Sequence, residues 1–255
     1  GEVWEDASNK ISYGARRHYL LGNQLDSVMN YPLAEAMLRF MRDGIAEELM
    51  ESIVSICENY PRQILNSLMN HIGTHDTARI ITRLTNSEIE KKPRSLQAKY
   101  KISPEEYEAG KAYLKVITVL QYMLPGFPCI YYGDEAGLSG GSDPFNRACF
   151  PWGREDSELT EHYRLLGRLR SSLPCLKDGA FVPISAMLGC IAFVRESKEA
   201  NCSIIVIINR NSHQIDYYLP ERYKYSEELL TNTPCGEFVN VPKIGAAVVK
   251  AKYLD

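Results

Sequence analysis

The feature that most constrains the fold is a change of periodicity near residue 177. Before it, short apolar stretches alternate with segments whose apolar side chains recur every three or four residues, and polar residues directly follow the apolar stretches. That order is typical of alternating strands and helices in a parallel α/β sheet or barrel. After it, apolar and polar residues alternate with period two between turn residues, which indicates a small antiparallel β-domain. We therefore predict an α/β domain over residues 1–176 and an all-β domain over residues 177–255.

The same patterns place the individual elements. Ser103, Pro104 and Glu106 are typical of a helix start, because Ser caps free amides and Pro tolerates the first helical position. Residues 88–101, rich in Lys and Glu, predict an exposed loop or a loosely held helix. The strands that we expect cover 24–29, 65–72, 128–132, 190–194, 204–208, 215–219 and 246–249, and the helices begin at Pro32, span 45–60, begin at Pro104 and span 161–173.

The composition excludes several classes of protein. Hydrophobic residues make up 45% and charged residues 24% of the chain, and the net charge of −3 predicts no nucleic-acid partner, which needs clustered positive charge. The longest apolar run, residues 204–208, is far shorter than the roughly 20 residues of a membrane span, so we expect no membrane partner. The seven cysteines are scattered without a Cys-x-x-Cys pair, which indicates free thiols in a reducing compartment and hence a cytoplasmic protein.

Polar residues at the ends of the predicted strands are candidates for a site. The run GTHDTAR at 73–79 follows an apolar strand, and ligands of parallel α/β proteins bind at the carboxyl ends of strands. The alternative is a plain loop in which Asp76 caps the next helix and Arg79 is solvated. His71 and His75 are four residues apart, but Gly73 lies between them and no Glu stands beside the first His, so we predict no metal site.

Two further segments leave alternatives open. Residues 1–6 carry three carboxylates, which by composition alone indicate an exposed, fraying terminus. The Gly-rich residues 133–144 form a long loop that either lines a ligand cleft or makes plain turns. The aromatic residues near this loop either stack on sugar rings or pack in the core. They are Tyr131, Tyr132, Phe150 and Trp152.

Four stretches together resemble the glycoside hydrolase family 13 enzymes, the α-amylase family, and most of all its neopullulanase, cyclomaltodextrinase and maltogenic amylase group. They are GEVWEDAS at 1–8, QLDSVMNYPLAEAM at 24–37, GTHDTARI at 73–80 and LPGFPCIYYGDEAGLSGGSDPFNRACFPW at 124–152. The resemblance covers essentially the whole chain. It implies the C-terminal half of a (β/α)₈ TIM barrel, from the end of the fifth strand to the eighth helix, followed by an antiparallel β-sandwich.

The resemblance also implies roles for individual residues. Glu2 matches the family's general acid/base, and Asp76 matches the second essential carboxylate, which holds sugar hydroxyls. His75 matches a neighbouring histidine that binds the same sugar. The implied partners are α-glucan oligosaccharides, and no cofactor is implied beyond a structural calcium ion whose ligands mostly fall upstream. The further substrate-binding residues that it implies are Trp4, Arg79, Asp143 and Arg147.

One part of the family's site has no match in the chain. The family's nucleophile, an Asp after the fourth barrel strand, would lie before Gly1. A retaining glycosidase needs an acid and a nucleophile about 5–5.5 Å apart. We therefore expect a C-terminal fragment of an α-glucan-cleaving enzyme that is inactive alone; the alternative is a catalytically silent carbohydrate-binding or assembly module. Half a barrel leaves open strand edges, so we also expect a homodimer or a swapped assembly that covers them.

Overall fold

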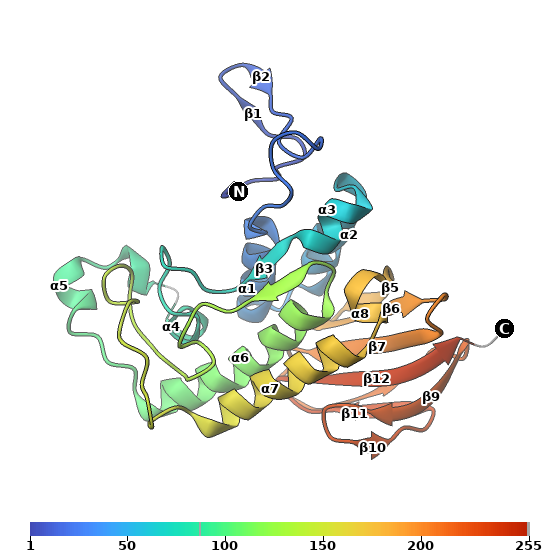
Figure 1. Cartoon of the computed structure of the whole chain (residues 1–255). Coiled ribbons are helices and arrows are strands. Elements are labelled where there is room, and N and C mark those ends of the chain that lie inside the picture. Colours follow the sequence, from blue (N-terminus) through green and yellow to red (C-terminus); the bar gives the residue numbers. More distant parts are fainter. Residues whose placement is uncertain (87, 254–255) are drawn as a thin grey trace.

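The computed structural model of the chain describes residues 1–86 and 88–253, so the last two residues of the predicted all-β domain lie outside the described residues. Figure 1 shows the helices gathered beside a large sheet, with the β1–β2 hairpin projecting from the other end. The first part contains β1 (Ile11–Ser12), β2 (Ala15–Arg16), α1 (Tyr31–Asp43), α2 (Ala46–Asn59), α3 (Arg62–Ser67), β3 (Met69–His71), α4 (Ile80–Thr85), η1 (Ile89–Lys91), α5 (Arg94–Gln97), α6 (Pro104–Met123), β4 (Phe127–Cys129), α7 (Ser157–Ser172) and α8 (Cys175–Asp178). The second part contains β5 (Ala180–Met187), β6 (Cys190–Ser197), β7 (Cys202–Asn209), β8 (Ile215–Tyr218), β9 (Tyr223–Glu228), β10 (Thr233–Pro234), β11 (Phe238–Val241) and β12 (Gly245–Tyr253).

Three short parallel segments lie at the centre of the first part. β3 and β4 pair in parallel, with Met69 opposite Phe127, and Met29 forms a parallel bridge to Met69. The strands predicted at 65–72 and 128–132 are therefore present but shorter than expected, and the predicted strand 24–29 is reduced to the bridge at Met29. The prediction was wrong for the first half of 65–72, because α3 extends to Ser67. This helix begins directly after Pro61, whose fixed backbone suits the start of a helix.

The helices begin close to the predicted signals. In α6 the Ser103 hydroxyl accepts a hydrogen bond from the Glu106 amide at 3.1 Å, and the Glu106 carboxylate accepts one from the Ser103 amide at 2.9 Å. α7 starts earlier than expected because the Asp156 side chain caps it. Residues 88–101 are held more firmly than expected, since Ile89 and Gln97 of its short helices are buried.

The second part is built on a six-stranded antiparallel sheet in the order β10-β9-β12-β7-β6-β5, and β8 and β11 pair as a separate ribbon. Both faces of the sheet are buried. In β7, Ile204, Val206 and Ile208 belong to the hydrophobic cluster on the helical side, whereas Ile205 and Ile207 belong to the cluster shared with β11. The two faces follow from the period-two geometry of a strand, and they explain the continuous apolar run over these residues.

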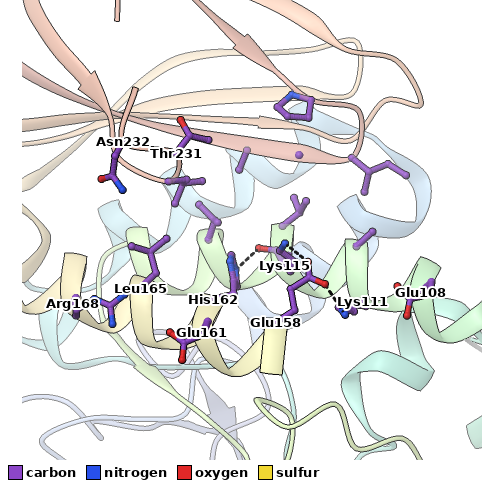
Figure 2. Close-up of a pocket in the computed structure, with 18 residues that line it drawn as sticks. Glu108, Lys111, Lys115, Glu158, Glu161, His162, Leu165, Arg168, Thr231 and Asn232 are labelled. Carbon is purple, nitrogen blue, oxygen red and sulfur yellow. Dashed lines mark hydrogen bonds and ion pairs between the residues drawn. The ribbon is translucent and has the colours of Figure 1, made fainter. Parts of the chain in front are cut away.

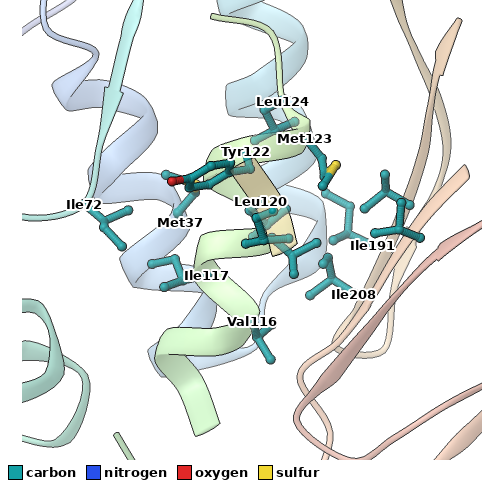
Figure 3. Close-up of a cluster of buried hydrophobic side chains, with 14 of the residues drawn as sticks. Met37, Ile72, Val116, Ile117, Leu120, Tyr122, Met123, Leu124, Ile191 and Ile208 are labelled. Carbon is teal, nitrogen blue, oxygen red and sulfur yellow. The ribbon is translucent and has the colours of Figure 1, made fainter. Parts of the chain in front are cut away.

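α6 joins the two parts. From Leu114 to its end nearly every residue is buried, so the helix has no solvent face there. Figure 3 shows Ile117 of α6 near Met37 and Ile72, with Ile191 and Ile208 of the sheet on the other side. The helices and the sheet therefore share one hydrophobic core. Among the described residues, no helix combines the length and apolar character needed to cross a lipid bilayer.

Candidate functional site

The Glu2 side chain contacts the hydroxyl group of Tyr31, and the negative charge of Asp76 acts on the same hydroxyl group. That hydroxyl donates a hydrogen bond to Glu2 Oε1 at 3.1 Å. Burial, followed by this hydrogen bond and by the negative charges of Glu2 and Asp76, raises the pKa of Tyr31 above its ordinary value. The two carboxylates that the sequence singled out therefore lie in the same region, at the carboxyl ends of the parallel segments.

Glu2 is positioned by the backbone of its neighbours. The Gly1 amino group donates to the Ser27 carbonyl at 2.7 Å, and the Gly1 carbonyl accepts from the Met29 amide at 2.9 Å. Val3 is buried in a small hydrophobic cluster. Glu2 itself is exposed, but these contacts hold its backbone against the strand end, so the fraying-terminus alternative is wrong for this residue.

Tyr31 also organises the aromatic side chains of the site. Its ring stacks on Trp4 with centroids 4.0 Å apart, and His71 meets it edge-on at 4.5 Å. Trp4 is 54% exposed, which leaves surface for contact with a sugar ring. Burial, and then the charge of Arg83, lowers the pKa of His71 to about 4, so this imidazole is neutral.

A network of buried side-chain amides holds the backbone next to Tyr31. The Asn30 side chain caps α1 by accepting from the Leu33 amide at 3.4 Å, and its Nδ2 donates to Asn70 Oδ1 at 3.1 Å. Asn70 Nδ2 in turn donates to the Pro125 carbonyl at 2.7 Å. The network ties the start of α1 to β3 and to the segment before β4, which fixes the relative positions of the three strand ends.

The His75–Asp76 turn is held by a residue from a distant loop. Asn146 is fully buried, and its Nδ2 donates to the carbonyls of His75 and Thr77, each at 2.7 Å. His75 Nε2 lies 3.3 Å from Asp76 Oδ2, and both side chains are partly exposed. The alternative in which Asp76 caps the next helix is wrong, because Arg79 occupies the N-cap of α4 and no side chain caps it.

The predicted substrate-binding residue Arg79 is in the interior. Its side chain is 0% exposed, and Nη1 lies 3.1 Å from Asp134 Oδ1. The same nitrogen donates to the Tyr132 carbonyl, and the guanidinium lies over the ring of Tyr131 at 4.3 Å. Burial raises the pKa of Asp134 to about 7, against the opposing effect of Arg79. A side-chain carbon on Gly73 would collide with the Asp134 carboxylate. The pair therefore packs beneath the turn, and neither the solvated alternative nor direct substrate contact fits this placement.

Asp143 and Arg147 lie in the loop that Asn146 attaches to the turn. Arg147 Nε lies 2.6 Å from Asp143 Oδ1, and both side chains are about half exposed. The loop is also tied to α4, since the Arg79 amide donates to the Gly140 carbonyl and the Gly140 amide donates to Thr82 Oγ1, both at 3.0 Å. The structure thus brings this loop beside the His75–Asp76 turn.

Sequence reasoning missed two residues of this arrangement, Tyr31 and Asn146. Tyr31 directly follows a predicted strand, so its place at a strand end was the available signal. Asn146 carried no such signal, because its partners are backbone carbonyls about seventy residues earlier in the chain.

A depression of about 650 Å³ lies between α6, α7 and the sheet, as Figure 2 shows. Its charges are largely neutralised by one another: Glu158 lies 2.7 Å from Lys111 Nζ and 2.8 Å from Lys115 Nζ. His162 Nε2 lies 3.0 Å from the Lys115 carbonyl, and burial lowers its pKa to about 4. The groove lacks the convergent carboxylates of the Glu2–Asp76 region, so we place the candidate site at the strand ends.

Across residues 1–86 and 88–253, no three His, Cys, Asp or Glu side chains gather in an arrangement that could hold a metal ion.

The chain is similar to known carbohydrate-active enzymes. The family model "Alpha amylase, catalytic domain" matches residues 1–165. A cyclomaltodextrinase from Geobacillus thermopakistaniensis is 32% identical over 237 residues, and a maltogenic α-amylase from Bacillus acidopullulyticus is 31% identical over 240; each match covers 91% of this chain and 35% of the relative. A solved cyclomaltodextrinase structure superposes with a TM-score of 0.76 at 28% identity, over 99% of this chain and 40% of that one. The chain spans about a third of the length of these curated relatives.

Proposed function

The chain belongs to the α-amylase family of glycoside hydrolases, and from this premise we propose that it supplies the acid/base part of a site that cleaves α-glucosidic bonds in maltodextrins, cyclodextrins or pullulan. The observation that carries the proposal is the hydrogen bond from the Tyr31 hydroxyl to Glu2, in a region where the charge of Asp76 also acts on that hydroxyl. A retaining mechanism needs a second carboxyl group as nucleophile. We assign that group to a segment outside these residues, so the chain alone is inactive.

In the proposed reaction Glu2 is the group that moves protons. It first donates a proton to the glycosidic oxygen while the nucleophile forms a bond to the anomeric carbon. Glu2, now a carboxylate, then takes a proton from the water that displaces the nucleophile. Because the Tyr31 hydroxyl occupies Oε1, the other carboxyl oxygen is the one that exchanges the proton. This chemistry uses carboxyl groups alone, so we propose no cofactor for it.

The remaining residues are proposed to hold the sugar. Asp76 and His75 would bind hydroxyl groups of one glucose unit, since both are partly exposed in a turn that Asn146 fixes. Trp4 would stack on a sugar ring with its exposed face. Asp143 and Arg147 would line the rim as a paired acid and base. Buried Arg79 is assigned a positioning role beneath the turn.

We propose the corresponding finer description of the fold, with residues 1–176 as the later part of a (β/α)₈ barrel and 177–255 as a β-sandwich. The parallel order Met29, β3, β4 and the β8–β11 ribbon over the sheet support it. Phe127 in β4 and Ile130 next to it are 44% and 40% exposed. We propose that the preceding barrel strands cover this edge in the full-length protein, and that a second copy covers it when the chain is isolated. Sedimentation velocity of the isolated chain should show dimers; a well-folded monomer would contradict this assembly.

The free cysteines support a cytoplasmic location, which is also a proposal.

The experiment that tests the activity uses the full-length protein and cyclodextrin or pullulan as substrate. Glu2→Gln should lower kcat by roughly 10²–10⁴-fold, the range of general acid–base catalysis. Glu5→Gln is the matched control, because exposed Glu5 pairs with Lys10 and takes no part in the cluster. The isolated chain should bind maltoheptaose without hydrolysing it. Full activity in the Glu2→Gln variant would contradict the assignment, and binding without hydrolysis by the full-length protein would favour a silent carbohydrate-binding module.

A further inference from the structure

Two cysteine side chains meet where the helices join the sheet. Cys175 is the first residue of α8 and Cys202 is the first residue of β7, and their Sγ atoms lie 2.7 Å apart. Both are free thiols. A disulfide bond is about 2.05 Å long, so only a small movement separates these atoms from bonding distance.

The two thiols differ in their access to solvent. Cys175 is 0% exposed and belongs to the core cluster that the helices share with the sheet. Cys202 is partly exposed at the edge of the same cluster. A small oxidant in solution can therefore reach Cys202 first, because Cys175 is buried in the core.

We propose that Cys175 and Cys202 form a redox site that closes to a disulfide when it meets a hydroperoxide. The Cys202 thiolate attacks one oxygen of the hydroperoxide and the O–O bond breaks. That oxygen stays on sulfur as a sulfenic acid, and the other oxygen leaves as water or an alcohol after accepting a proton. Cys175 then loses its proton and attacks Cys202 Sγ, the S–S bond forms, and the hydroxyl group leaves as water. The two thiols supply the two electrons that reduce the peroxide.

The order of the two steps follows from the environment of the sulfur atoms. Burial, and then the hydrogen bond with Cys202, raises the pKa of Cys175 well above its ordinary value. Because the thiolate is the nucleophile, Cys175 is a poor first attacker, and Cys202 reacts first. Cys175 attacks only in the second step, in which its proton goes to the hydroxyl group that leaves as water.

The disulfide bond would link α8, which follows α7, to β7 of the sheet. The two cysteines are 27 positions apart in the chain, so the bond would close a loop that contains β5 and β6. A disulfide across a loop of that length should raise the midpoint of thermal unfolding by about 5–10 °C.

The experiment exposes the reduced 255-residue chain to hydrogen peroxide, removes the excess and blocks the remaining thiols in denaturant. We expect the loss of two of the seven thiols, and a crosslink between the tryptic peptides that contain Cys175 and Cys202. The oxidised chain should unfold at a higher temperature than the reduced chain, and dithiothreitol should reverse both changes.

Two variants sharpen the result. Cys202→Ser should abolish the crosslink and the thermal shift, whereas Cys190→Ser, which removes a buried cysteine outside the pair, should keep both. The proposal is overturned if wild-type peptide mapping finds only crosslinks to other cysteines, or only sulfinic acid at Cys202. It is equally overturned if the two thiols stay free while exposed Cys149 is oxidised.

Discussion

The Tyr31 hydroxyl donates a hydrogen bond to Glu2 Oε1 at 3.1 Å while its ring stacks on Trp4 at 4.0 Å. One side chain thus orients the proposed acid/base and supports the exposed aromatic surface beside it. The two contacts use different parts of the residue, so they can be separated by substitution.

Tyr31→Phe keeps the ring and removes the hydroxyl. A hydrogen bond to a charged group is worth about 1.5–3 kcal/mol, and the exposure of Glu2 favours the lower end, so kcat/KM of the full-length protein should fall about ten-fold. Steady-state hydrolysis of cyclodextrin measures the effect. Tyr13→Phe, at a position that is 97% exposed, should have no effect. An unchanged kcat/KM in Tyr31→Phe would show that the hydrogen bond does not serve catalysis.

Asn146→Ala should loosen the His75–Asp76 turn. The substitution removes both hydrogen bonds from Nδ2 and leaves two carbonyls without this partner, so the free energy of unfolding should fall by about 1–3 kcal/mol. Maltoheptaose binding, measured by titration calorimetry, should weaken as well. Asn240→Ala removes an exposed amide that bonds Asp216, and it should leave binding unchanged. Equal affinity in both variants would separate Asn146 from the site.

At about pH 8, above the raised pKa of Asp134, Asp134→Asn should destabilise the chain by about 3–5 kcal/mol, because it leaves the buried Arg79 guanidinium without its counter-charge. Urea denaturation measures the loss. The double variant Arg79→Met with Asp134→Leu should recover part of it, since no buried charge remains. Glu88→Gln, which breaks the exposed pair with Lys91, should have no measurable effect. If Asp134→Asn were as stable as wild type, the pair would have no structural role.

His162 should make the stability depend on pH. Its pKa is lowered from 6.5 to about 4 by burial, so the unfolded state binds more protons between these values. Its contribution is complete above pH 6.5 and is lost as the pH falls toward 4, by about 3 kcal/mol in all.

The measurement is the free energy of unfolding of wild type and His162→Gln across this range. The difference between them isolates His162, because His71 acts in the same sense and Asp134, with its raised pKa, in the opposite one. Parallel pH curves for wild type and His162→Gln would refute the prediction.

Local signals predicted much of the fold. The capping box at Ser103 and the apolar run in β7 are encoded in neighbouring residues, and both formed as expected. The run at 65–72 was misread, because residues at the end of α3 and in β3 look alike without knowledge of the helix that begins after Pro61.

The site was less predictable, because its key contacts join residues far apart in the chain. The matching stretches pointed to Glu2 and Asp76, but nothing local shows that Tyr31 bonds Glu2 or that Asn146 holds the turn. The burial of Arg79 depends on the loop around Asp134 closing over it. Likewise, scattered cysteines give no hint that Cys175 and Cys202 meet.

The core shared by α6 and the sheet has a consequence for anyone who would shorten this protein. Val116 and Ile208 belong to one hydrophobic cluster, so a version cut after residue 176 would expose a large apolar surface to water where the sheet had been. Such a truncation would be a substrate for chaperones and proteases. The sheet therefore cannot be removed without exposing the apolar face of the helices that pack against it.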